Sequence, residues 1–149
     1  MRVPRATLAL LLLVLAPRGL LAAERESIAV VVGVGSSIRQ VTVDTLRELY
    51  LRRQRLWPNG ERAMPVNLPA DDPLRVAFSR RVLGRRPGDL EPYWLRLYRE
   101  GVQPPLVLQT SQAVCAYVAV EPAAIGYVRP DGVDPKSCRV LLVLAVEWD

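Results

Sequence analysis

Residues 28–32 read IAVVV, and residues 33–37 continue as GVGSS. A short continuous apolar run, without the alternation of a half-exposed strand, predicts a strand that is buried on both faces. The glycines and serines that follow interrupt the run and predict a turn. We therefore expect a sheet in which this first strand lies inside the protein.

The chain beyond this strand alternates between helical and extended patterns. The pair Asp72-Pro73 predicts a helix start, because aspartate caps helices and proline fits the first helical position, and Gly84 is expected to end this helix. Further helices are expected over 43–53, 89–101 and 111–122, and further strands over 64–68, 124–128 and 140–146. The last strand has seven apolar residues and is expected to be central. This alternation predicts an α/β domain with a mixed sheet.

The first residues have the pattern of an exported protein. Arg2 and Arg5 precede an apolar run over 6–16, and small residues follow at Ala22 and Ala23. This pattern predicts a secretory signal peptide over 1–23, because the run is shorter than the roughly 20 residues that span a bilayer. A buried N-terminal helix is the alternative. We expect a mature domain over 24–149 that is periplasmic or secreted from a bacterium, without a membrane span.

Much of the positive charge lies in the predicted signal peptide. Three arginines and no acidic residue lie within 1–23, so the formal net charge of +5 for the whole chain becomes +2 for 24–149. Arginines remain clustered at 52–55, 80–81 and 85–86. These clusters indicate either an anion-binding or nucleic-acid surface, or the solvated faces of helices. Interspersed acidic residues and few nearby aromatics favour solvated faces, so we expect no nucleic-acid partner.

The chain contains two cysteines, Cys115 and Cys138, and no histidine. The lack of histidine excludes a Ser-His-Asp triad, a Cys-His pair and histidine-based metal sites. An even number of cysteines in an oxidising compartment favours a disulfide. Two small buried thiols are the alternative, because spacing in the sequence does not fix the distance between the Cα atoms. We expect no metal, no cofactor and no catalytic residue.

An ordered set of short motifs resembles a known family. The set comprises Leu46-x-x-Leu49-Tyr50-Leu51, Leu56-Trp57-x-x-Gly60, Pro65-Val66-Asn67-Leu68, Pro73-Leu74-Arg75-x-x-Phe78, Tyr93-Trp94, Gly101-x-x-Pro104-Pro105 and Ala124-Ile125-Gly126-Tyr127-Val128. Behind a signal peptide, this order resembles the short, single-lobe relatives of the periplasmic phosphate-binding proteins, the solute receptors of phosphate ABC transporters. The resemblance implies a single lobe of a type II periplasmic-binding fold, with a mixed sheet flanked by helices. It also implies inorganic phosphate or a similar oxyanion as ligand, and a transporter permease or another envelope protein as partner.

The chain departs from this family at the loop that binds the anion. Larger members hold the anion between two lobes, whereas residues 24–149 are about the size of one lobe. Their strand matching 65–68 leads into an Arg-x-Asp-Gly-Ser-Gly-Thr loop at a helix N-terminus. Leu68, Ala70, Asp72, Pro73 and Leu74 stand here at the positions of the arginine, the aspartate, the serine, a glycine and the threonine. Asp72 would occupy the helix N–H groups and Pro73 has none, so we do not expect phosphate at this loop.

The turn after the first strand offers a different set of groups to an oxyanion. Gly35, Ser36 and Ser37 combine a flexible backbone with two hydroxyl groups, which can form an anion nest. Arg39 is a candidate charge partner for this nest. The match to a glycine-rich phosphate motif is weak, because no lysine follows and the third glycine of a dinucleotide motif is missing. An ordinary turn is the alternative.

Arg75 and Asn67 complete the candidate ligand-binding residues. Arg75 is a second possible charge partner for an anion at the first turn. The alternative is a surface arginine in the first helical turn that pairs with Asp71 or Asp72. Asn67 is either a hydrogen-bonding residue of a pocket or the end of a strand. Sequence alone leaves these alternatives open.

Three aromatic residues have two interpretations as well. Trp57, Tyr93 and Trp94 are expected either to line a groove for a ligand or partner, where aromatics are enriched, or to belong to the core. For Trp94 the helical spacing of its apolar neighbours favours the core.

Three functions from different classes fit the sequence. The first is an exported, non-enzymatic solute-binding protein of the phosphate-receptor type. The second is an envelope protein-interaction module that keeps the lobe fold and has lost the anion site. The third is a hydrolase or transferase that uses the adjacent carboxylates Asp71 and Asp72, but helix capping explains this pair better than acid–base chemistry. We therefore expect no enzymatic activity.

Overall fold

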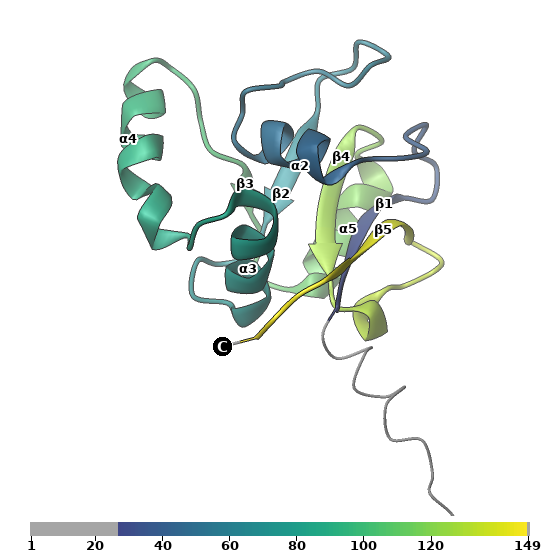
Figure 1. The fold of residues 1–149 in the computed structure, drawn as a ribbon. Helices are drawn as coiled ribbons and strands as arrows, with labels where there is room; N and C mark the ends of the chain where they lie inside the picture. Colours follow the sequence, from purple (N-terminus) through teal and green to yellow (C-terminus); the bar gives the residue numbers. More distant parts are fainter. Residues whose placement is uncertain (1–26, 149) are drawn as a thin grey trace, which may run out of the picture.

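The computed structural model describes residues 27–148, so the predicted signal peptide over 1–23 lies outside the described residues. Within them, one sheet contains β1 (Ser27–Gly33), β2 (Met64–Asn67), β3 (Leu106–Val107), β4 (Ala124–Val128) and β5 (Cys138–Ala145), in the order β3-β2-β4-β1-β5 (Figure 1). β2 is parallel to β3 and β4, whereas β1 is antiparallel to β4 and β5. The expected α/β class with a mixed sheet is confirmed.

Four α-helices accompany the sheet in the described part: α2 (Val43–Tyr50), α3 (Pro73–Phe78), α4 (Glu91–Arg99) and α5 (Ser111–Val120). Shorter helical turns lie at Ser79–Leu83, Gly88–Leu90 and Pro130–Gly132, the first of them π-helical. α5 packs on β1 and β4, whereas α4 stands apart at one side of the molecule (Figure 1). Within residues 27–148, no helix has the length and apolar composition that crossing a membrane requires.

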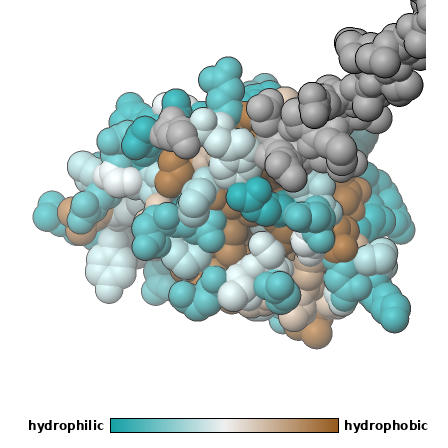
Figure 2. Space-filling model, turned by 90° about the horizontal axis from the view of Figure 1, so that it is seen from below, coloured by the Kyte–Doolittle hydropathy of each residue, from teal (hydrophilic) through white to brown (hydrophobic). Residues whose placement is uncertain are grey.

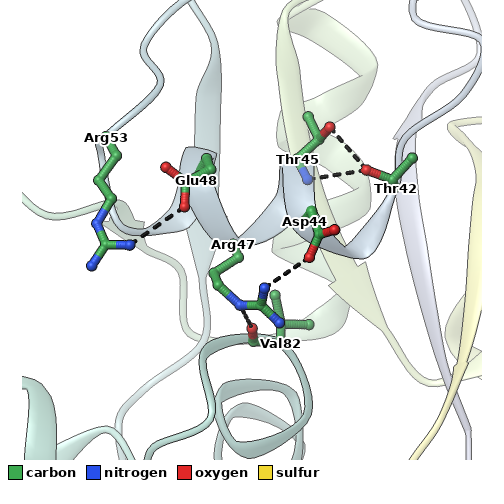
Figure 3. Close-up of polar contacts among 7 residues, drawn as sticks. All are labelled: Thr42, Asp44, Thr45, Arg47, Glu48, Arg53 and Val82. Carbon is green, nitrogen blue, oxygen red and sulfur yellow. Dashed lines mark hydrogen bonds and ion pairs between the residues drawn. The ribbon is translucent and has the colours of Figure 1, made fainter.

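Side-chain caps explain where α2 and α3 begin. Thr42 Oγ1 accepts a hydrogen bond from the Thr45 amide at 3.1 Å, as Figure 3 shows. Asp72 Oδ1 accepts one from the Leu74 amide at 2.8 Å, so the start predicted for α3 is confirmed. Each cap satisfies an N–H group that has no partner inside its helix.

The helices and strands lie within a few residues of the predicted ranges, but the fold differs from the sequence predictions in the position of one strand and in the end of one helix. The prediction that the strand over 140–146 is central is wrong. This strand, β5, lies at the edge of the sheet with Val140 and Val143 exposed, and β4 is central. An apolar run alone does not specify whether a second neighbouring strand exists. The helix predicted to run to Gly84 consists of α3, which ends at Phe78, and a π-helical turn over Ser79–Leu83. The chain leaves this turn through Gly84, which has a φ of 71°.

Two glycines allow α5 to approach the sheet closely. A Cβ atom on Gly33, at the end of β1, would overlap the backbone carbonyl of Val118. A Cβ atom on Gly126 of β4 would overlap the side chains of Val114 and Val66. The helix therefore packs directly on the backbone of two neighbouring strands.

The opposite face of β4 carries an aromatic cluster. The rings of Phe78 and Tyr127 stack with their centroids 3.9 Å apart, and Tyr50 lies 4.7 Å from Phe78. All three side chains are buried. The Tyr50 hydroxyl donates to the carbonyl of Val66 at 2.9 Å, so this cluster joins α2, α3 and the two central parallel strands.

Cys115 and Cys138 form a disulfide, with their Cα atoms 5.4 Å apart. The bond joins α5 to the first residue of the edge strand β5. The disulfide expected from the even number of cysteines is therefore confirmed, and the alternative of two free thiols is wrong.

The surface mixes hydrophilic and apolar side chains. Hydrophilic residues cover most of the face in Figure 2, with apolar patches between them. Large apolar side chains that are exposed include Leu95, Tyr98, Leu106 and Val107. The first two belong to α4 and the last two to β3, and Leu95, Tyr98 and Val107 line the same groove.

Replacing Gly33 by alanine should destabilise the protein, because the new methyl group would overlap the backbone of α5, which cannot rotate aside. We expect the free energy of unfolding in urea to fall by about 1–3 kcal/mol, the usual range for overpacked sites. Gly35→Ala is the matched control, because nothing lies within 4 Å of its new Cβ atom. Equal stability of the two variants would contradict the close approach of α5.

Reducing the disulfide should lower the free energy of unfolding by about 3 kcal/mol on the chain-entropy model, for cysteines 23 positions apart in sequence. The measurement is urea unfolding with and without dithiothreitol. The double variant Cys115→Ala/Cys138→Ala is the control, and its midpoint should not respond to the reductant. A wild-type midpoint that also fails to respond would show that the two sulfur atoms are not bonded.

Candidate functional site

A groove of about 460 Å³ lies between α4 and the carboxyl end of β2. Its walls are mainly apolar and include Trp94, Leu95, Tyr98, Pro104, Pro105 and Val107. Its polar groups come from Asn67, Arg75 and Glu91. We name it the α4 groove. A larger hollow of about 530 Å³, against β5, contains none of the residues expected to bind a ligand.

The inner end of the α4 groove is a buried hydrogen-bonded group at the end of β2. The Tyr127 hydroxyl donates to Asn67 Oδ1 at 3.1 Å and accepts from the Leu68 amide at 3.3 Å. Arg75 Nη1 donates to the Leu68 carbonyl at 2.7 Å. Asn67 is the last residue of β2 and also lines the groove, so both of its interpretations describe its position, and its role in binding a ligand stays a prediction.

Arg75 is turned inward. Its side chain lines the groove, the residue is only 8% exposed, and its buried Nε has no hydrogen-bond partner within the described structure. The alternative of a surface arginine paired with Asp71 or Asp72 is wrong, since the ion pairs found in residues 27–148 are Arg47–Asp44 and an Arg53–Glu48 pair. A guanidinium that is buried without a carboxylate partner attracts an anion more strongly than one in water does.

The two buried tyrosines keep their protons in this environment. Burial raises the pKa of Tyr127 far above its usual range, and the positive charge of Arg75 offsets only part of this effect. Burial likewise raises the pKa of Tyr50. Both hydroxyls therefore stay hydrogen-bond donors at neutral pH, and neither is a base.

The N-terminus of α3, which neighbours the groove, is closed to anions. Asp72 occupies the Leu74 amide, and Pro73 has no N–H group. A free helix N-terminus binds anions through these donors and the helix dipole. Arg75, one turn further on, therefore supplies the positive charge that this helix presents to the groove.

Ser36, at the turn after β1, is a buried structural residue. Its hydroxyl donates to the Pro122 carbonyl at 2.6 Å and accepts from the Ile38 amide at 3.3 Å. Its own carbonyl, together with that of Ile38, accepts hydrogen bonds from Arg139 Nη2. These bonds fix the turn and leave little of the Ser36 side chain to a ligand.

The remaining candidates at this turn are solvent-facing. Gly35 and Arg39 are exposed, and Ser37 Oγ accepts a hydrogen bond from Asn59 Nδ2 at 3.3 Å. β1 is antiparallel to β4, whereas β2 is parallel to it. The turn after β1 and Asn67 at the end of β2 therefore lie at opposite ends of the strands. The structure therefore brings Asn67 together with Arg75 and separates both from the four residues of the first turn.

The aromatic residues divide between core and groove. Trp57 is 3% exposed and donates from Nε1 to the Ala123 carbonyl, so its core interpretation is confirmed. Trp94 lines the α4 groove, so its core interpretation is wrong. α4 buries none of its residues and is held by Tyr93, whose hydroxyl donates to the Leu51 carbonyl at 2.7 Å.

Sequence reasoning did not select the other walls of the groove, among them Leu95 and Tyr98. Both lie outside the apolar stripe that predicted the buried face of α4, and they are three positions apart. Residues at that spacing are neighbours on one helix face. The signal available in the sequence was that Leu95 and Tyr98 form a second apolar face on a helix whose first apolar face was already assigned to the core.

No family model and no curated protein matches this chain. Among solved structures, it is similar to an ABC-type phosphate transport receptor from Vibrio cholerae, with 18% identity and a TM-score of 0.61 over 77% of this chain and 45% of the receptor.

A second similar structure is a putative phosphate ABC transporter substrate-binding protein with bound phosphate from Clostridium perfringens. It shares 18% identity at a TM-score of 0.62, over 77% of this chain and 44% of that protein. The chain thus spans less than half the length of either structure. The fold implied by the sequence motifs, a phosphate-receptor-like arrangement in a short single-lobe form, is confirmed.

Proposed function

We propose that this chain is an exported, non-enzymatic binding protein whose ligand site is the α4 groove. An oxyanion such as phosphate is held there against Arg75 and Asn67. The observation that carries the proposal is a buried guanidinium that lines a groove and whose Nε has no hydrogen-bond partner in the described residues. A bound oxyanion would supply the missing acceptor and the missing negative charge.

The position of the groove supports this assignment. In open α/β sheets, ligands bind beyond the carboxyl ends of the strands. The α4 groove lies at that end of β2, where the parallel neighbour β3 also ends. The disulfide between α5 and β5 supports export, because such bonds persist in oxidising compartments.

A single lobe provides only one side of an anion site. Arg75 supplies the charge and Asn67 an amide, while the opposite side of the bound anion stays open to solvent. We therefore expect weak binding by this chain alone, and tighter binding where a second chain covers the groove.

A specific observation favours a second function, an envelope protein-interaction module. Leu95 and Tyr98 of α4 and Leu106 and Val107 of β3 are about half or more exposed at the groove side of the molecule. Interface centres are rich in such apolar and aromatic residues. The partner would be an apolar segment of an envelope protein, and the permease of a transporter is the partner that the fold resemblance implies.

Titration with phosphate at constant ionic strength should shift the NMR signal of the Trp94 indole N–H saturably, because Trp94 lines the groove. Trp57 lies in the core and should not respond. Phosphate at 100 times its dissociation constant should also stabilise the protein by about 2.7 kcal/mol, measured as a rise in the unfolding temperature. Chloride at equal ionic strength is the salt control.

Two charge-neutralising variants locate the effect. Arg75→Gln should abolish the Trp94 response, provided that its circular dichroism spectrum shows a folded protein. Arg39→Gln removes the same charge at the opposite end of the strands and should leave the Trp94 response unchanged. No response in the wild type would contradict oxyanion binding in the groove. Loss in Arg39→Gln alone would place the ligand at the first turn.

A further inference from the structure

We propose a second anion site in a hollow of about 290 Å³ that is lined by Arg52, Arg55, Arg62 and the segment 101–103. Its ligand is a compact oxyanion with two or more negative charges, of which a phosphate group, free or as a monoester, is the representative. We name it the three-arginine hollow. It lies near the start of β2, whereas the α4 groove lies at the end of that strand.

Local backbone structure brings these arginines together. Arg52 follows the last turn of α2, and its Nη1 donates to the Ala63 carbonyl at 3.3 Å, directly before β2. Arg55 and Arg62 lie on the two sides of a turn: the Ala63 amide donates to the Arg55 carbonyl at 2.9 Å, and Leu56 pairs with Arg62. Each side chain therefore starts from a fixed position at the hollow.

The charge of the hollow is not balanced within the described structure. None of its three arginines forms an ion pair there, whereas the neighbouring Arg53 pairs with Glu48 at 3.4 Å (Figure 3). Burial lowers the pKa of Arg52, and the positive charges of Arg62 and Arg55 lower it further. Like charges at close range repel, so a multiply charged anion would relieve an existing repulsion.

Arg52 carries one further feature of a binding residue, since its Nε is buried without a hydrogen-bond partner within residues 27–148. Its position is fixed by the cap that ends α2. The Arg53 amide donates to the Glu48 carbonyl at 2.9 Å and the Arg52 amide to the Leu49 carbonyl at 3.1 Å, with Arg52 at a φ of 60°. This left-handed helix ending places the Arg52 guanidinium at the wall of the hollow.

The ligand class follows from the chemistry of three guanidinium groups. Each one presents a planar fork of N–H donors that matches two oxygens of a phosphate or sulfate group. A monovalent anion would leave most of the repulsion in place. A dianion with oxygens on several sides can contact more than one fork and neutralise more of the charge.

The test is a titration of the 15N-labelled protein with phosphate, sulfate or glycerol phosphate, followed at the backbone amide signals of Gly101 and Val102. We expect saturable shifts with all three, and none with chloride at equal ionic strength. A monoester that binds much more tightly than inorganic phosphate would identify an ester as the source of the phosphate group. Shifts that chloride reproduces would overturn the proposal.

Variants separate this site from general charge effects. Arg55→Gln and Arg62→Gln should each weaken binding by at least about tenfold, because each removes one fork. Both side chains are exposed, so urea unfolding should show that these variants remain folded. Arg85→Gln, an exposed arginine outside the hollow, is the charge-matched control and should bind like the wild type.

The test of the three-arginine hollow is separate from the test of the α4 groove, because the first is followed at the Gly101 and Val102 amides and the second at the Trp94 indole. Wild-type affinity in both Arg55→Gln and Arg62→Gln, or an equal loss in Arg85→Gln, would overturn the three-arginine hollow. Loss of the amide shifts in Arg55→Gln with an unchanged Trp94 response would confirm two separate sites.

Discussion

The buried hydroxyl of Tyr127 is the contact on which both the core and the α4 groove depend. Its ring stacks on Phe78 of α3, and its hydroxyl holds Asn67 Oδ1 and the Leu68 amide. A buried hydroxyl must be hydrogen-bonded, since an unpaired one costs about 1–3 kcal/mol. The packing of β4 against α3 therefore fixes the end of β2, and with it the carbonyl of Leu68 that holds Arg75. The geometry of the groove is thus a consequence of core packing.

Patterns that act over a few residues were sufficient to predict much of the fold. The apolar run of β1 predicted a buried strand, and Asp72-Pro73 predicted the start of α3, because both features act within one element. The position of β5 at the edge was not predictable in this way, since it depends on which strands pair. Asn67 and Arg75 could be chosen singly from the sequence, but their meeting depends on Tyr127, about 60 positions away.

α4 shows the limit of periodicity most clearly. Its spacing of apolar residues predicted a buried face, yet none of its residues is buried in the described structure. Tyr93 anchors the helix by a hydrogen bond to the end of α2. Leu95 and Tyr98 line the groove and are exposed. Periodicity specifies which side of a helix is apolar, whereas the depth of burial depends on what the rest of the chain places against it.

At the α4 groove, a side chain supplies the positive charge that a helix N-terminus would otherwise offer to an anion. The free N–H groups at a helix start supply partial positive charge. In α3, Asp72 accepts a hydrogen bond from one of these groups and Pro73 lacks an N–H group. Guanidinium groups supply full charges that salt screens according to their exposure. Arg75 is buried, so its attraction for an anion resists salt, whereas Arg55 and Arg62 are exposed and lose theirs as ionic strength rises. The two proposed sites, although both depend on arginine, therefore differ in the conditions under which each can be occupied.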